Sequence, residues 1–175
     1  MCGIVGAVGL PGCSGTLLDS LKRLEYRGYD SSGIVTQQDG GLIMSRAVGK
    51  LVNLQEVMHQ QPLPGSAGIG HTRWATHGGV SERNAHPHIA AGKVAIVHNG
   101  IIENHGVLRA DLQANGHSFD SETDSEVLAH LFHHAFDNGM SPREAGVYVI
   151  SRIEGTFGFA AMHADYPDMM IVGRN

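Results

Sequence analysis

The chain has 175 residues, of which 42% are hydrophobic and 17% charged, so it can bury a core and falls in the size range of one domain. Its net charge of -5 and pI of about 6.1 argue against a surface for nucleic acid or anionic membranes. The apolar runs are far shorter than the roughly 20 residues of a membrane span, and no basic leader precedes the first one, so we expect a cytoplasmic protein. Two cysteines, Cys2 and Cys13, make no disulfide framework.

In the first half of the chain, apolar patterning predicts strands and amphipathic helices. A helix capped by Ser14 is expected because Leu17, Leu18, Leu21 and Leu24 fall on one face. The elements expected here are a buried strand at 2–10, this helix at 14–26, a hairpin of 32–37 and 42–49 around Gly40-Gly41, and a helix at 51–60.

The second half alternates further strands with three helices. A helix that starts at Ser141 carries Glu144 three residues later, which is the capping-box arrangement. The other elements expected are a strand from 67 that runs into a polar loop, a strand at 93–100 that stops at an Asn-Gly turn, helices at 104–115 and 123–138, and an antiparallel pair at 155–165 and 168–175. No linker divides residues 1–175, and the pattern indicates an α+β fold of antiparallel sheets covered by helices.

Cys2 directly follows the initiator methionine and precedes a glycine. Removal of Met1 would leave Cys2 with a free α-amine beside its own thiol. Because an α-amine has a pKa of about 7.7 to 8.0, it can act as the base for that nucleophile. The alternative is a passenger cysteine at the start of a buried strand, and the stretch MCGI by itself does not decide between the two.

Asn99 and Gly100 follow an apolar strand, in the stretch VHNG. A thiol that attacks an amide or ester creates an oxyanion, which the Asn99 amide and the Gly100 N–H could stabilise. Taken alone, an Asn-Gly pair more often marks an ordinary hairpin turn.

Charged and aromatic residues mark two further candidate positions. Arg73 lies in the loop HTRWATHG and suits a carboxylate through a bidentate pair, while Trp74 beside it could form a lid or wall, or could serve only the core. Asp124 is expected in the first turn of a helix, where it could bind a substrate ammonium or simply complement the helix dipole.

Twelve histidines raise the question of a metal site. The pairs at 86 and 88 and at 133 and 134 lack the paired spacings of zinc ligands, and neither C-x-x-C nor H-E-x-x-H occurs. We therefore expect no metal, and we expect His130, His133 and His134 on a helix surface.

Six stretches together resemble the glutaminase domain of the glutamine–fructose-6-phosphate aminotransferases, a type 2 glutamine amidotransferase of the N-terminal-nucleophile superfamily. They cover essentially the whole chain and read MCGIVGA, LEYRGYDSSG, GHTRWATHG, NAHPH, VHNGIIENH and SETDSEV. The related phosphoribosylpyrophosphate amidotransferases share the terminal Cys-Gly and the Asn-Gly but typically have HRGQDS where this chain has YRGYDS. The resemblance implies a four-layer αββα sandwich and hydrolysis of glutamine to glutamate and ammonia, with no cofactor.

The same resemblance implies a role for each matching residue. Cys2 would be the nucleophile and, through its amine, the base, and Asn99 with Gly100 would form the oxyanion hole. The residues expected to bind or enclose glutamine are Arg73 at its carboxylate, Asp124 at its ammonium, Thr76 and His77 in the pocket wall, and Trp74 on a closing loop, with Arg27 and Tyr29 near the thiol.

In the family, this domain continues into further strands and then into sugar-isomerase domains that bind fructose 6-phosphate. We therefore expect residues 1–175 to be a partial domain, with the sandwich incomplete at its C-terminus and the sugar site elsewhere. Two other readings stay open, a non-catalytic relative that binds glutamine or a partner chain, and a histidine-rich metal binder. A homodimer stays open as well.

Overall fold

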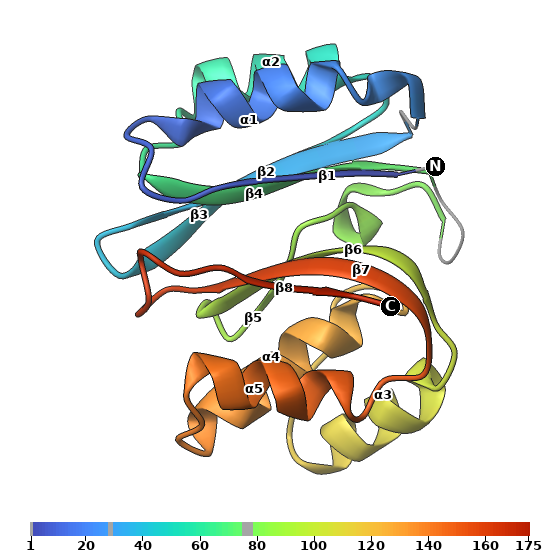
Figure 1. The fold of residues 1–175 in the computed structure, drawn as a ribbon. Helices are drawn as coiled ribbons and strands as arrows, with labels where there is room; N and C mark the ends of the chain where they lie inside the picture. Colours follow the sequence, from blue (N-terminus) through green and yellow to red (C-terminus); the bar gives the residue numbers. More distant parts are fainter. Residues whose placement is uncertain (1, 28–29, 75–78) are drawn as a thin grey trace.

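The computed structural model describes residues 2–27, 30–74 and 79–175, which form two antiparallel sheets packed between two layers of helices (Figure 1). The first sheet has the order β1 (Gly3–Ala7), β4 (Ala67–Arg73), β2 (Ser31–Gln38), β3 (Gly41–Val48). The second has the order β5 (His88–Ala90), β6 (Val94–Ile102), β7 (Gly155–His163), β8 (Ile171–Arg174). The predicted αββα order and the α+β class are confirmed.

Helices cover the outer face of each sheet (Figure 1). On the first sheet lie α1 (Cys13–Lys22) and α2 (Leu51–Gln60), and on the second lie α3 (His105–Ala114), α4 (Glu126–Asp137) and α5 (Pro142–Ile150). Two short 3-10 turns complete the elements, η1 (Glu25–Arg27) and η2 (Glu82–Asn84). The sequence predicted all five α-helices and missed the three-residue strand β5, which is too short to show a periodic pattern.

The start of α1 differs from the prediction. Ser14 was expected to cap this helix, but the N-cap position is Gly12, whose φ of 65° is left-handed, and no side chain caps it. Glycine adopts that conformation without steric cost. The helix therefore begins at Cys13, before the start that a Ser14 cap would give. The predicted apolar face is confirmed for Leu17, Leu18 and Leu21, which are buried.

One further boundary shifts, and one predicted boundary is confirmed. The hairpin between β2 and β3 turns at Asp39 and Gly40, both with positive φ, and Gly41 already belongs to β3. The α5 capping box is present as predicted, since Ser141 accepts from the Glu144 N–H and Glu144 accepts from the Ser141 N–H.

Apolar side chains from both sheets fill the space between them. This inner cluster includes Val35 and Ile69 from the first sheet and Val97 and Met162 from the second. Burial of such side chains stabilises the face-to-face packing by about 25 cal/mol per Å² of apolar area. The two sheets are therefore held at a fixed separation, and residues at their ends face one another across it.

The histidines of α4 are less exposed than predicted, and the surface position predicted for His130 is wrong. His130 is buried, and His133 and His134 are half-buried, because His117 packs its ring against all three at centroid distances of 5.3 to 5.9 Å. Helical periodicity alone shows how these side chains are spaced around the helix. It does not show the segment after α3 that covers them.

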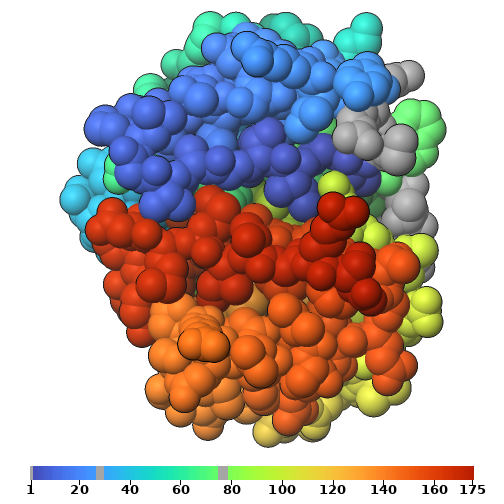
Figure 2. Space-filling model, viewed as in Figure 1, coloured from blue at the N-terminus to red at the C-terminus, as the bar shows by residue number. Residues whose placement is uncertain are grey.

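Strand β8 forms an edge of the second sheet, and Figure 2 shows it (red) between the N-terminal layers (blue) and the helical layer that includes α5 (orange). Among the described residues, no helix is long and apolar enough to cross a membrane.

Candidate functional site

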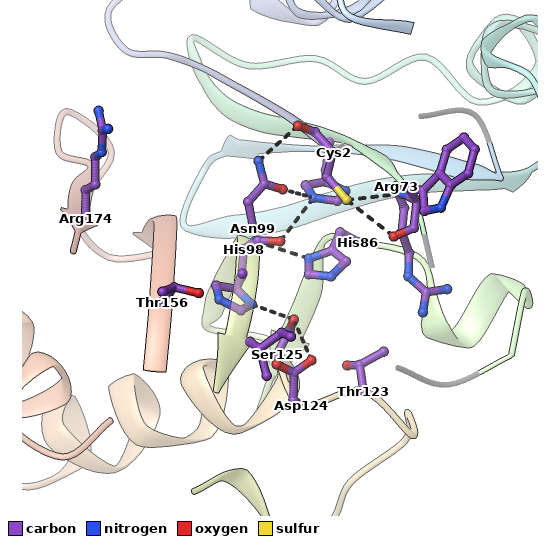
Figure 3. Close-up of a pocket in the computed structure, with 14 residues that line it drawn as sticks. Cys2, Arg73, His86, His98, Asn99, Thr123, Asp124, Ser125, Thr156 and Arg174 are labelled. Atoms are coloured by element: carbon purple, nitrogen blue, oxygen red, sulfur yellow. Dashed lines mark hydrogen bonds between the residues drawn. The ribbon is translucent and has the colours of Figure 1, made fainter. Parts of the chain in front are cut away.

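A cavity of about 720 Å³ opens where the ends of β1 and β4 face β6 across the two sheets (Figure 3). This volume lies in the range of small-molecule sites. Its walls are formed by Cys2, His71, Arg73, Trp74, His86, His98, Asn99, Gly100, Ile101, Thr123, Asp124, Ser125, Thr156 and Arg174. Six residues singled out from the sequence, widely separated along the chain, thus line one cavity.

Cys2 lies just before β1, next to the end of β4. Its sulfur accepts the backbone N–H of Trp74 at 3.1 Å, and its thiol donates to the Trp74 carbonyl at 3.5 Å. The antiparallel pairing of Gly3 with Thr72 sets this position, because it carries the residue before Gly3 alongside the residues that follow Thr72. The Trp74 side chain is 53% exposed, so it does not serve the core.

Asn99 and Gly100 do not form the turn that an Asn-Gly pair usually marks. They lie within β6, which continues to Ile102, and Asn99 pairs with Gly158 of β7. Gly100 has a φ of 127°, and a Cβ added there would stand 2.0 Å from the Thr156 carbonyl oxygen. Only glycine fits this strained position. The predicted end of the strand at this pair was wrong.

The side chain of Asn99 bridges the two sheets (Figure 3). Its Nδ2 donates to the Cys2 carbonyl at 3.2 Å, and its Oδ1 lies 2.8 Å from Nε2 of His71. The amide nitrogen therefore faces the residue that carries the thiol.

A buried cationic side chain and a buried anionic side chain lie at separate points of the cavity wall. Arg73 is 4% exposed, and its Nη1 donates to the Gly79 carbonyl at 3.3 Å. Asp124 is 3% exposed, and its Oδ2 accepts the Ile102 N–H at 2.8 Å. Helix α4 begins at Glu126, so Asp124 lies before the helix and not in its first turn as predicted. A buried cation and a buried anion in one cavity suit a zwitterionic ligand.

Four histidines on or near the cavity wall are buried and uncharged. Burial lowers the pKa of His71 to about 4, of His98 to about 4 and of His88 to about 3, and it lowers the pKa of His86 well below its usual range. All four imidazoles are therefore neutral at pH 7. His86 accepts the His98 backbone N–H at 3.3 Å, which leaves its Nδ1 without a proton.

His98 connects the histidine cluster to the acidic wall. Its Nδ1 lies 2.8 Å from Ser125 Oγ, and that hydroxyl stands 3.5 Å from Asp124 Oδ1. Its Nε2 is buried without a hydrogen-bond partner among the described residues.

Sequence reasoning missed His71, His86, His98, Thr123 and Ser125 as parts of this wall. A signal existed for His71, since it alternates with Arg73 along β4 and so shares its face. No comparable signal existed for Ser125, whose position depends on packing between α4 and β6.

Three predicted residues, Thr76, His77 and Tyr29, lie outside the described residues, and the side chain of Arg27 is likewise not described. Their predicted roles stay predictions. Within the described part of the chain, no group of three or more His, Cys, Asp or Glu side chains is arranged to hold a metal ion.

The profile of the family described as "Glutamine amidotransferase domain" matches residues 71–175, more than half of the chain. The chain belongs to this family. Its Asn99, Gly100 and Asp124 lie inside the matched segment, while Cys2 lies before it.

Two relatives are both named glutamine–fructose-6-phosphate aminotransferase [isomerizing]. The one from Streptomyces coelicolor is 52% identical over 99% of this chain and 29% of its own length. The one from Zymomonas mobilis is 52% identical over 99% of this chain and 28% of its own length. The chain thus spans under a third of the curated relatives it matches.

Solved structures agree on the fold. The glutamine phosphoribosylpyrophosphate amidotransferase from B. subtilis superposes with a TM-score of 0.82 at 24% identity, over the whole of this chain and 37% of its own. A structure described as the allosteric regulatory enzyme of purine biosynthesis gives 0.83 at 25% identity, with the same coverage. The four-layer arrangement is therefore that of the amidotransferases.

Proposed function

We propose that this chain hydrolyses the side-chain amide of L-glutamine through Cys2, releasing glutamate and ammonia. The observation that carries the proposal is the thiol of Cys2 at the wall of a cavity that also holds the Asn99 amide. Membership in the glutamine amidotransferase domain family supports it.

In the proposed reaction, removal of Met1 frees the α-amine of Cys2, which takes the thiol proton as the sulfur attacks the amide carbon. The resulting tetrahedral oxyanion is stabilised by Asn99 Nδ2 and the Gly100 N–H. When this tetrahedral intermediate collapses, its C–N bond breaks. The α-ammonium of Cys2 donates its proton to the leaving nitrogen, which departs as ammonia. Water, deprotonated by the same amine, then attacks the thioester and releases glutamate and the free thiol.

Binding of the substrate is assigned to the charged wall. The Arg73 guanidinium would pair with the α-carboxylate of glutamine through two parallel hydrogen bonds, and Asp124 would accept from its α-ammonium. Thr76 and His77 are proposed for the pocket wall and Trp74 for a closing loop, with Arg27 and Tyr29 near the thiol.

The names of the relatives suggest where the ammonia goes. We infer that residues 1–175 are part of an amidotransferase domain that supplies ammonia for glucosamine 6-phosphate synthesis from fructose 6-phosphate, in concert with sugar-isomerase domains in the cytoplasm. Use of phosphoribosylpyrophosphate as acceptor is the alternative. It has less support, because the matching structure is only 24% identical against 52% for the aminotransferases.

The test is an assay for glutamate, ammonia and amino sugar in one reaction, with wild-type chain and Cys2→Ala. Wild type should release glutamate and ammonia in equal amounts and form no amino sugar from added fructose 6-phosphate, and Cys2→Ala should be inactive. A diazoketone analogue of glutamine should add once, at Cys2, by intact mass. Failure of wild type both to hydrolyse glutamine and to be labelled would favour a non-catalytic binding protein.

A further inference from the structure

The tautomer of His71 follows from what its ring nitrogen contacts. Nε2 lies 3.1 Å from the His98 carbonyl oxygen and 2.8 Å from Oδ1 of Asn99. A carbonyl oxygen can only accept a hydrogen bond, so Nε2 must carry the proton. The ring is fully buried on β4 and stacks on His86 at a centroid distance of 4.2 Å, which fixes its plane.

This tautomer decides which way the Asn99 amide points. An asparagine amide rotated by 180° exchanges its oxygen and its nitrogen. In the rotated form, the Asn99 NH2 would face the His71 N–H at hydrogen-bond distance, two donors against each other. The His71 donor therefore selects the rotamer in which Nδ2 faces Cys2, 3.2 Å from its carbonyl oxygen.

The selected orientation matters for an oxyanion donor. A rotated amide would present an oxygen to the developing negative charge and would repel it. Preorganised donors act because they need no reorganisation during the reaction. His71 also joins the two sheets here, since it lies on β4 while His98 and Asn99 lie on β6.

We propose that His71 is a positioning residue, whose Nε2–H holds the Asn99 side-chain amide in the orientation that stabilises the oxyanion. This inference rests on the proposed glutaminase function. His71 acts through Asn99 and touches no reacting atom in this role.

The first experiment compares His71→Leu, which removes the donor, with His71→Gln, whose amide N–H reaches a similar distance from the backbone. Loss of the donor should lower kcat for glutamine hydrolysis by about tenfold to a hundredfold with little change in KM, since only the transition state is affected. His71→Gln should recover most of the loss. His130→Leu, a buried histidine of the outer layer, is the control for removal of an imidazole from a core. A rise in KM at unchanged kcat in His71→Leu would overturn the proposal.

The second experiment is a double-mutant cycle with Asn99→Ala. If His71 acts through Asn99, adding His71→Leu to Asn99→Ala should lower kcat no further. Equal losses in the two backgrounds would show that His71 acts by another route and would overturn the proposal.

A third measurement does not depend on activity or on variants that fold. The ¹⁵N resonances of the His71 ring in the wild-type protein should show Nε2 protonated and Nδ1 bare at pH 7. The reverse tautomer would overturn the proposal. If wild type hydrolyses glutamine and only these tests fail, the positioning role alone is refuted, whereas absent hydrolysis and absent labelling of Cys2 refute the function itself.

Discussion

The backbone N–H of Trp74 points at the sulfur of Cys2 across 3.1 Å, so the main chain at the end of β4 holds the thiol. This contact depends on the peptide nitrogen and not on the identity of the side chain. Two different substitutions of Trp74 can therefore test the backbone N–H and the indole side chain separately.

Trp74→Pro should slow alkylation of Cys2 by iodoacetamide about threefold to tenfold, because the lost N–H no longer stabilises the thiolate. Trp74→Ala keeps the N–H and should leave the rate close to wild type. The second cysteine interferes little, since Cys13 is fully buried and burial raises the pKa of its thiol. Equal slowing in both variants would contradict a main-chain role.

Gly100→Ala should destabilise the protein by about 2 kcal/mol or more and abolish glutamine hydrolysis. The reason is the left-handed φ of 127° together with a Cβ position 2.0 Å from the Thr156 carbonyl oxygen. Gly158→Ala is the matched control, because Gly158 stands opposite Asn99 on β7 and a Cβ there meets nothing within 4 Å. Urea unfolding measures both, and equal midpoints for the two variants would refute the strain.

Asp124→Asn should raise the KM for glutamine at least tenfold with a smaller change in kcat. An asparagine oxygen still accepts the Ile102 N–H, so the local structure is kept while the negative charge is removed. Asp120→Asn, at an exposed carboxylate four residues earlier, should leave KM unchanged. An unaltered KM in Asp124→Asn would place the ammonium elsewhere.

Acid should destabilise the protein in a pH window set by the buried histidines. Unfolded histidines have a pKa near 6.5, whereas burial lowers the pKa to about 4 in His71 and His98 and to about 3 in His88. Between these values the unfolded chain binds more protons than the folded one, so the free energy of unfolding falls as the pH drops from 6.5 toward 4.

Urea unfolding at pH 7, 5.5 and 4.5 checks this dependence, and a constant midpoint would contradict it. His88→Gln supplies the control, since glutamine does not titrate and can still hydrogen-bond to Thr123 Oγ1, which lies 3.0 Å from His88 Nε2. The loss of stability between pH 6.5 and 4 should be shallower in that variant.

Local pattern was enough to predict most of the secondary structure. Amphipathic periodicity located the five helices, and short apolar runs bounded by turn residues helped to locate seven of the eight strands, because burial of a helix face or of a whole strand leaves a local pattern in the sequence. The predicted ends of these elements were less accurate. Gly12 rather than Ser14 precedes α1, since capping depends on backbone geometry that serine propensity does not reveal.

The sequence by itself determined the candidate chemistry of this protein, and the tertiary structure decided its geometry. A terminal cysteine, an arginine, an Asn-Gly pair and an aspartate could be named from residue type alone, because reactivity and charge belong to the side chains. Asn99 and Gly100 belong to a strand rather than a turn because they pair with β7, which follows only much later in the chain. The contact of His71 with Asn99 depends on the packing of β4 over β6. A contact between residues on two sheets has no local signature in the chain.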